Sequence, residues 1–258
     1  MLIKEYALKL YWKSPNLVKR VLLSLFSFVM RLINPLISYK IKKGKFSSKK
    51  IRFISDLNDL IEFVSKFQYL GFSIKTAQVK DEIIEFLKIL KSYRPNVILE
   101  IGTAGGGTLF LFTRIAQSNA TIISVDLPKG FYGGGYKKWK SPIYRSFAIQ
   151  KQKVKLIRAN SHSQETLNAV KHLMNQKKID FLFIDGDHTY AGVKKDFEMY
   201  SNLVKKGGII AFHDIVEHSS EGGCQVNKFW DEIKNNYQTL EIIQDKSQKW
   251  AGIGIIFY

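Results

Sequence analysis

Residues 97–108 read VILEIGTAGGGT, an apolar run that carries one acid, Glu100, and ends in a glycine-rich turn. Consecutive apolar side chains predict a strand buried on both faces, and glycines let the backbone approach a ligand just before a helix begins. The stretch lacks the Gly-Lys-Ser/Thr ending of a phosphate-binding P-loop, which disfavours a nucleoside triphosphatase. It therefore predicts the first strand, turn and helix of an α/β fold whose ligand lies at this turn.

Further apolar runs follow and alternate with helical stretches. The runs cover residues 121–127, 154–160, 180–186 and 208–214, and the helices cover residues 107–118, 143–151, 163–176 and 189–204. This alternation indicates a parallel sheet covered on both faces. After a helix at 225–237, two last runs at 240–245 and 250–258 are joined by four residues, so they must pair antiparallel. We predict a doubly wound, mostly parallel, seven-stranded Rossmann-like sheet with one antiparallel strand in its C-terminal hairpin.

The composition excludes several protein classes. The chain has 258 residues, 45% hydrophobic and 24% charged, which is ordinary for a folded soluble protein and excludes wholesale disorder and a polytopic membrane protein. Cys224 is the one cysteine, so there is no internal disulfide, and we interpret it as structural. We divide the chain into a basic extension (1–50), a helical lead-in predicted from Phe53 to Tyr93 (51–95) and the main domain (96–258).

The net charge of +18 is concentrated in residues 1–50, which hold twelve lysines and arginines against Glu5. Residues 16–39 are largely apolar, but charges and a proline interrupt the roughly 20 apolar residues that a transmembrane helix needs. The interruptions are Lys19, Arg20, Arg31 and Pro35. The segment predicts a helix that packs on the domain, on a second subunit, or on an anionic membrane surface. Nucleic acid is a weaker expectation, because aromatic and basic residues are not interleaved. We expect a cytoplasmic protein, peripheral on the inner face of the membrane if the lysines touch lipid.

Asp126 follows the second run, about 20 residues after the glycine turn, where doubly wound nucleotide-binding folds place an acid on the ribose hydroxyls. The alternative is a turn residue before Pro128. Glu100 distinguishes the loop from a plain dinucleotide fingerprint, which needs no acid before its first glycine.

Five segments in this order, LEIGTAGGGT, SVDLP, RANSHS, FLFIDGDHTYAGVKKDFEMY and VKKGGIIAFHDI, resemble the class I S-adenosylmethionine-dependent methyltransferases. Within them the chain is most similar to the cephalosporin-hydroxylase-like and macrolide-sugar O-methyltransferase branch, over residues 75–258. The resemblance implies transfer of a methyl group from S-adenosylmethionine to a hydroxyl of a small molecule, a sugar or glycoconjugate, with help from a divalent metal. The basic extension would bring the enzyme near a lipid-linked acceptor.

The resemblance also implies roles for individual residues. Those implied to bind the cofactor are Glu100, Gly102, Thr103, Gly105, Asp126, Asn160, Ser161 and Asp185. In metal-dependent relatives, the acid at the position of Asp185 and an acidic pair after the next strand bind a cation, Mg²⁺ or Mn²⁺. This sequence departs from that pattern with His213 and Asp214, and imidazole shifts the preference away from Mg²⁺. The alternative is that the acids cap strand ends and bind substrate through hydrogen bonds alone.

His188 is the candidate general base, because an imidazole of ordinary pKa suits the task and lies in the same loop as Asp185. Asp187 competes for this role, and a strut for the turn at Thr189 is the alternative for His188. The loop 129–140 is a candidate lid whose aromatic residues could stack on a sugar. Those residues are Tyr132, Tyr136 and Trp139, with Lys137 or Lys138 for a phosphate and Gly222-Gly223 as the other rim. The remaining histidines, His162, His172 and His218, are interpreted as structural.

Two other functions stay open from the sequence. The basic charge suggests an RNA methyltransferase, although base N-methylation needs no metal. A non-catalytic cofactor-binding or scaffold protein would keep the fold without the acceptor site. The oligomeric state is open, with a homo-oligomer among the expectations.

Overall fold

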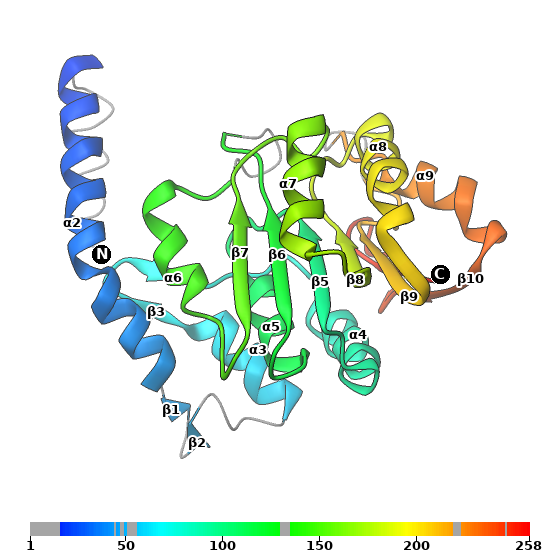
Figure 1. The fold of residues 1–258 in the computed structure, drawn as a ribbon, viewed down its shortest axis with the longest axis horizontal. Coiled ribbons are helices and arrows are strands. Elements are labelled where there is room, and N and C mark those ends of the chain that lie inside the picture. Colours follow the sequence, from blue (N-terminus) through cyan, green and yellow to red (C-terminus); the bar gives the residue numbers. More distant parts are fainter. Residues whose placement is uncertain are drawn as a thin grey trace.

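One sheet of seven strands lies at the centre of the computed structural model (Figure 1). The strands are β5 (Val97–Ile101), β6 (Thr121–Val125), β7 (Lys153–Ile157), β8 (Ile179–Ile184), β9 (Val204–His213), β10 (Gln238–Ile242) and β11 (Ile253–Phe257). Their order is β10-β11-β9-β8-β5-β6-β7. β11 pairs antiparallel with β9 and β10, and the other neighbouring pairs are parallel. The predicted sheet with one reversed strand is confirmed.

The structure describes residues 16–43, 45–46, 49–50, 56–129, 135–218, 223–245 and 247–258. Several sequence-based expectations lie outside the described residues. They concern Tyr132, Gly222 and the lysines Lys4, Lys9 and Lys13.

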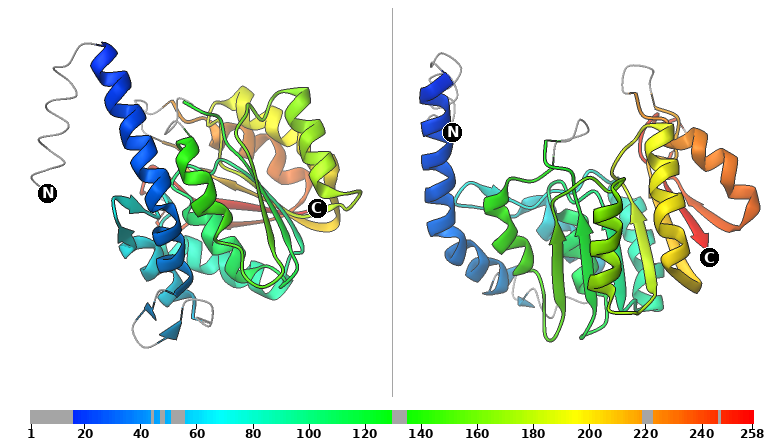
Figure 2. Two further views of the ribbon diagram at one scale, coloured as in Figure 1. Left: turned by 60° about the vertical axis from the view of Figure 1, so that its left-hand side comes forward. Right: turned by 45° about the horizontal axis from the view of Figure 1, so that its top comes forward.

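Helices cover both faces of the sheet (Figures 1 and 2). One face carries α3 (Leu57–Lys66), α4 (Lys80–Tyr93), α5 (Gly107–Ile115) and α6 (Ser141–Arg145). The other face carries α7 (Gln164–Met174), α8 (Tyr190–Tyr200) and α9 (Val226–Ile233). Single turns of 3₁₀-helix are η2 (Lys138–Lys140), η3 (Ser201–Leu203) and η5 (Lys234–Asn236). This layering explains why the central strands are apolar throughout.

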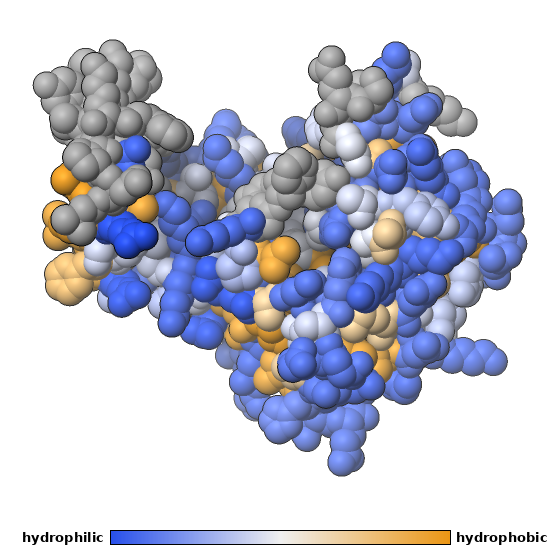
Figure 3. All heavy atoms as spheres, turned by 90° about the horizontal axis from the view of Figure 1, so that it is seen from above, coloured by the Kyte–Doolittle hydropathy of each residue, from blue (hydrophilic) through white to orange (hydrophobic). Residues whose placement is uncertain are grey.

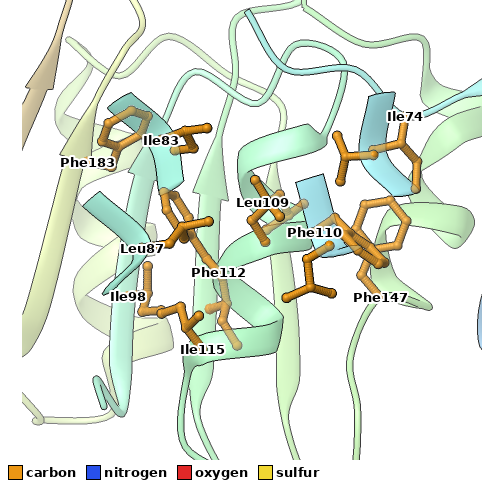
Figure 4. Packing of buried hydrophobic residues seen from close by; sticks show 14 of the residues in the cluster. Ile74, Ile83, Leu87, Ile98, Leu109, Phe110, Phe112, Ile115, Phe147 and Phe183 are labelled. Atoms are coloured by element: carbon orange, nitrogen blue, oxygen red, sulfur yellow. The ribbon is translucent and has the colours of Figure 1, made fainter. Parts of the chain in front are cut away.

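Successive side chains of a central strand pack into the hydrophobic clusters on opposite faces of the sheet. Ile98 packs with Leu87 and Phe112 on the side of α4 and α5 (Figure 4). Its neighbour Leu99 belongs to the cluster on the opposite face, with Val193 of α8. Because side chains alternate along a strand, a strand covered on both faces needs apolar residues at every position.

The chain reverses its direction of winding at β5. It builds β6 and β7 on one side and then returns to place β8 and β9 on the other. The carboxyl ends of β5 and β8 therefore flank the crevice where ligands bind in open α/β sheets. The turns that follow these two strands are the ones singled out by the sequence.

The helical lead-in differs from its prediction. The two stretches of helical spacing within residues 53–93 form α3 and α4, but an antiparallel pair that was not predicted, β3 (Gln68–Tyr69) and β4 (Phe72–Ser73), separates them. Leu70 and Gly71 between them have φ values of 47° and 78°, which end the helical path. Phe72 is buried and its ring meets those of Trp139 and Tyr144 edge-on, so tertiary packing holds the hairpin in place.

The predicted helix at 143–151 is also shorter than expected. α6 ends at Arg145, because Ser146 turns its hydroxyl back to the carbonyl oxygen of Ile143, at 2.6 Å. Such local side-chain bonds compete with helix continuation.

The N-terminal helix α2 (Asn16–Lys43) is continuous over 28 residues, with Pro35 inside it. A second short pair, β1 (Lys45–Phe46) and β2 (Lys49–Lys50), follows it. By length and composition alone, Val18–Ile41 is apolar enough to cross a membrane, with a mean hydropathy of 1.8. The helix predicted in this segment is therefore present, and it runs through Arg31 and Pro35 without a break.

Candidate functional site

The glycine turn after β5 packs tightly against two other segments. Gly102 has φ of 100°, and a Cβ there would collide with the backbone oxygen of Asp185 at the end of β8. A Cβ on Gly105 would lie 2.7 Å from the carbonyl oxygen of Lys75. Glycine is thus required both by conformation and by space, which brings the ends of β5 and β8 together.

We expect Gly102→Ala to destabilise the fold by at least about 3 kcal/mol, because strain at positive φ adds to a backbone collision. Gly71→Ala is the matched control, since Gly71 also has positive φ (78°) but an added Cβ would meet nothing within 4 Å. Urea unfolding of both variants measures the difference. Equal losses would show that the contact with Asp185 is unimportant.

Glu100 lies beneath the turn and not in the cavity, which changes its predicted role. Its side chain is 0% exposed and accepts hydrogen bonds from the hydroxyls of Thr108 and Ser124, both at 2.5 Å. Burial raises the pKa of Glu100 to about 8, although these two hydrogen bonds oppose the shift. Thr103, also buried, shares a hydrogen bond with Ser124 at 2.5 Å. Glu100 and Thr103 therefore position the turn from below.

Asp126, directly after β6, reaches the turn from the side. Its Oδ2 accepts a hydrogen bond from the N–H of Ala104 at 3.0 Å. Burial raises the pKa of Asp126 to about 6, against the hydrogen bonds that the backbone donates to it. The carboxylate therefore faces the cavity in its charged form at neutral pH.

A cavity of about 440 Å³ opens at the carboxyl ends of the strands. Its lining comes from the turns after β5, β6, β7 and β8: Ile101, Gly102, Ala104, Val125, Asp126, Leu127, Gly135, Ala159, Asn160, Ser161, His162, Asp185, Gly186, Asp187 and Thr189. The structure thus brings together five predicted cofactor residues and Asp187. This volume is typical of a small-molecule or cofactor site.

Beside the cavity, carboxylates and imidazoles gather between the ends of β8 and β9. Nδ1 of His213 lies 3.3 Å from Oδ1 of Asp185 and 3.2 Å from Oδ2 of Asp214. His188 bridges the same acids, with Nε2 3.4 Å from Asp185 and Nδ1 3.2 Å from Asp214. Ligand atoms of Asp185, His213 and Asp214 all lie within 4.8 Å of one another, so the three could hold one metal ion.

In this cluster the imidazoles favour the positively charged form and the carboxyl groups favour the negatively charged form. Burial alone would lower the pKa of His188, but Asp185, Cys224 and Asp214 outweigh it and raise the pKa to about 11. The same balance raises the pKa of His213 to about 10. Burial would raise the pKa values of Asp185 and Asp214, and the neighbouring histidines hold both below the ordinary value. The two carboxylates thus favour the charged form of His188, whose environment differs from that of the ordinary imidazole assumed for a general base.

Asp187, the other candidate base, lines the cavity. Its Oδ1 accepts hydrogen bonds from the N–H and the hydroxyl of Thr189, at 3.0 and 2.8 Å. Thr189 in turn caps α8 by accepting from the N–H of Gly192. One carboxylate oxygen of Asp187 is thus hydrogen-bonded to the residue that caps α8.

Three residues of the cluster were not predicted to be functional. Nε2 of Gln78 donates to Oδ2 of Asp185 at 2.9 Å, and Nε2 of His218 lies 3.1 Å from Oδ1 of Asp214. Cys224 contacts His188 and forms a second possible metal-binding group with His188 and Asp214. The structural interpretation of His218 and Cys224 is therefore incomplete. Gln78 stands 107 residues from its partner, and no local motif marks it.

The predicted lid differs from its prediction where it is described. Tyr136 and Trp139 are only 3% and 5% exposed, and Tyr136 packs on the ring of Tyr144. They are therefore core residues and not a stacking platform for a sugar. The apolar environment of α6 and α2 outweighs the polar composition of the loop. Gly135, in the loop that follows Asp126, does line the cavity.

Comparison with known proteins adds three findings. Residues 99–215 match a family model described as a methyltransferase domain. The uncharacterized protein R132 of Acanthamoeba polyphaga mimivirus is 34% identical over 120 residues, which are 46% of this chain and 52% of that protein. The alignment thus spans about half the length of this curated relative. The family match covers each residue predicted for the cofactor, the metal and the base.

Two solved structures share the fold. The O-methyltransferase from Bacillus cereus in complex with SAH has a TM-score of 0.50 at 19% identity, over 72% of this chain and 84% of that one. The O-methyltransferase TomG from Streptomyces achromogenes, involved in tomaymycin synthesis and in complex with SAM, has a TM-score of 0.51 at 13% identity, over 78% and 89%. Residues 99–215 thus match the methyltransferase-domain model and lie on the predicted Rossmann-like sheet, in agreement with the motif resemblance.

Proposed function

We propose that this chain is an S-adenosylmethionine-dependent O-methyltransferase that acts on a hydroxyl of a small molecule, a sugar or glycoconjugate, with help from a divalent metal. The observation that carries the proposal is the position of Asp185, which lines the cavity and also belongs to the cluster that could hold a metal ion. One side chain thus joins a cofactor-sized cavity to groups that can activate a hydroxyl. The O-methyltransferase names of the two similar structures support the reaction, and the motif resemblance supports the sugar.

The cavity residues suit each part of the cofactor. Asp126 is held at the turn by Ala104 and can accept hydrogen bonds from two ribose hydroxyls. Asn160 and Ser161, after β7, line the side where the adenine would lie. Gly102 exposes its backbone to the methionine portion, because no side chain covers it.

The cluster fits a divalent metal. Asp185, His213 and Asp214 supply two carboxylates and an imidazole, whose ligand atoms all lie within 4.8 Å of one another. Nδ1 of His213 faces both carboxylates, at 3.3 Å from Asp185 and 3.2 Å from Asp214, so that nitrogen would share a cation with them once the ring gives up its proton. A bound dication would lower the pKa of an acceptor hydroxyl and orient its oxygen. Because the donor set contains nitrogen, we propose Mn²⁺ before Mg²⁺.

The transfer itself exchanges one bond for another. The acceptor oxygen attacks the methyl carbon in line, the O–C bond forms as the S–C bond breaks, and S-adenosylhomocysteine leaves. The hydroxyl proton goes to a base within hydrogen-bond reach. Asp187 lines the cavity and is our candidate base, whereas His188 lies against Asp185 and Asp214, at 3.4 and 3.2 Å, and positions them.

Methyl transfer from methyl-labelled S-adenosylmethionine to a panel of monosaccharides and glycosides tests the function. We expect a labelled sugar with Mn²⁺ and no label with EDTA. Asp126→Asn should raise the dissociation constant for S-adenosylmethionine at least about tenfold, because a neutral amide is a poorer acceptor for the ribose hydroxyls. Calorimetry measures the affinity directly, and Asp231→Asn, at an acid 63% exposed on α9, is the control.

Each contrary result removes a defined part of the proposal. If EDTA does not affect methyl transfer, the reaction does not require a divalent metal. Label in RNA and not in sugars would favour the RNA methyltransferase. If the wild-type protein does not bind S-adenosylmethionine, the methyltransferase proposal is excluded and a non-catalytic scaffold protein is the remaining alternative.

A further inference from the structure

Helix α2 carries most of the exposed large apolar side chains in the described part of the chain. Eleven of the sixteen lie on it: Val18, Val21, Leu22, Leu23, Leu25, Phe26, Phe28, Val29, Leu32, Leu36 and Tyr39. Figure 3 shows a group of apolar side chains at the end of the molecule that α2 forms. A contiguous apolar surface of this kind marks an interaction site.

The exposed residues form one stripe along the whole helix. At about 100° per residue, nine of the eleven fall within about 120° of one another, with Leu25, Leu32 and Leu36 near the middle. The buried residues of α2 lie on the opposite side: Met30, Asn34, Ile37 and Ile41. The domain therefore holds α2 by one face and leaves the apolar stripe directed away from itself.

The attachment of α2 to the domain is specific. Nδ2 of Asn34 donates to the carbonyl oxygen of Trp139 at 2.7 Å, and Phe26 meets the Trp139 ring edge-on. Trp139 belongs to η2, four residues after Gly135 of the cavity lining. In Figures 1 and 2 the N-terminal end of α2 projects beyond the α/β domain on the side of the strands' carboxyl ends. Direct contacts thus connect α2 to the segment that leads into the cavity lining.

Charge identifies the partner of the stripe. Arg20 and Arg31 are exposed together along one flank, and Lys40 borders the other. Residues 1–50 as a whole carry a net charge of +11. Two copies of the chain joined through this stripe would bring these charges together, whereas an anionic lipid surface attracts both the cations and the apolar side chains.

We propose that α2 docks the protein on an anionic membrane surface. The helix lies in the membrane plane, with the stripe in the boundary between headgroups and acyl chains and the α/β domain on the cytoplasmic side of the helix. A helix that spanned the bilayer would have to give up the contacts of Met30, Asn34 and Ile37 with the domain. The inference is independent of the reaction catalysed.

Flotation of the full chain with phosphatidylcholine vesicles, with and without phosphatidylglycerol, tests the proposal. We expect flotation only with phosphatidylglycerol, and release by alkaline carbonate. Leu32→Ser should weaken binding about tenfold, because Leu32 is 63% exposed in the middle of the stripe. Leu240→Ser, at another exposed leucine (39%) on β10, should leave binding unchanged. Joint replacement of Arg20 and Arg31 by Gln should weaken it about 20-fold.

Circular dichroism and thermal melting verify that each variant is folded. Equal flotation of Leu32→Ser and the wild type would overturn the proposal, as would equal binding to neutral vesicles. Retention after alkaline carbonate would show instead that α2 spans the bilayer. A dimer that Leu32→Ser dissociates, without flotation of the wild type, would assign the stripe to a second copy.

Discussion

Asp214→Asn is expected to abolish Mn²⁺ binding and to lower metal-dependent methyl transfer at least about 100-fold, while S-adenosylmethionine affinity stays unchanged. Asp214 is the centre of the cluster: Oδ2 lies 3.2 Å from both His188 and His213, and Oδ1 lies 3.1 Å from His218. It does not line the cavity, so the cofactor should not sense its loss. Electron paramagnetic resonance of free Mn²⁺ measures the metal, and calorimetry measures the cofactor.

Asparagine is the substitution of choice because it keeps the local structure. Asp214 has φ of 65°, a conformation that asparagine tolerates better than alanine does. Its Oδ1 accepts from the N–H of Ala251 at 3.2 Å, and an amide oxygen can do the same. Asp231→Asn again serves as the control. If the wild type binds no Mn²⁺, or if Asp214→Asn binds it as tightly, the cluster is a network of ion pairs and not a metal site.

The sequence predicts those features of the fold that depend on one element at a time. An apolar run such as 97–101 suits a strand covered on both faces, and the four residues between the runs at 240–245 and 250–258 are too few for a parallel crossover, which forces an antiparallel pair. The sequence also predicts that the acids after β6, β8 and β9 lie at one edge of the sheet, because the carboxyl ends of parallel strands meet at that edge.

The features that were missed depend on contacts between distant segments. Gln78 and His218 reach the cluster from the segment before α4 and from the turn after β9, and neither is marked by spacing. Tyr136 and Trp139 are polar-loop residues by sequence, and only the proximity of α2 and α6 buries them. The β3–β4 hairpin depends on the burial of Phe72 in the same place. Periodicity within one segment carries no information about such neighbours.

The buried carboxyl group of Glu100 lowers the stability of the folded protein at neutral pH. A carboxyl that is buried beneath the glycine turn cannot be charged without losing its hydration, and its pKa of about 8 records this. The raised pKa means that the folded state binds a proton more tightly than the unfolded state, where the ordinary value is 4.5. The resulting stabilisation is fully present below pH 4.5 and is lost as the pH rises through 8.

We therefore expect Glu100→Gln to stabilise the protein by about 3 kcal/mol at pH 7, because an amide needs no proton to stay neutral. The difference between variant and wild type should vanish near pH 4 and grow until about pH 9, and urea unfolding across this range measures it. The amide can still accept from Thr108 and face the hydroxyl of Ser124, which keeps the turn in place. Glu62→Gln, at an exposed acid paired with Lys66, should leave the pH dependence of the wild type unchanged. A less stable Glu100→Gln, or one that no longer binds S-adenosylmethionine, would show that the turn needs the carboxylate itself and not merely a hydrogen-bonding group of its size.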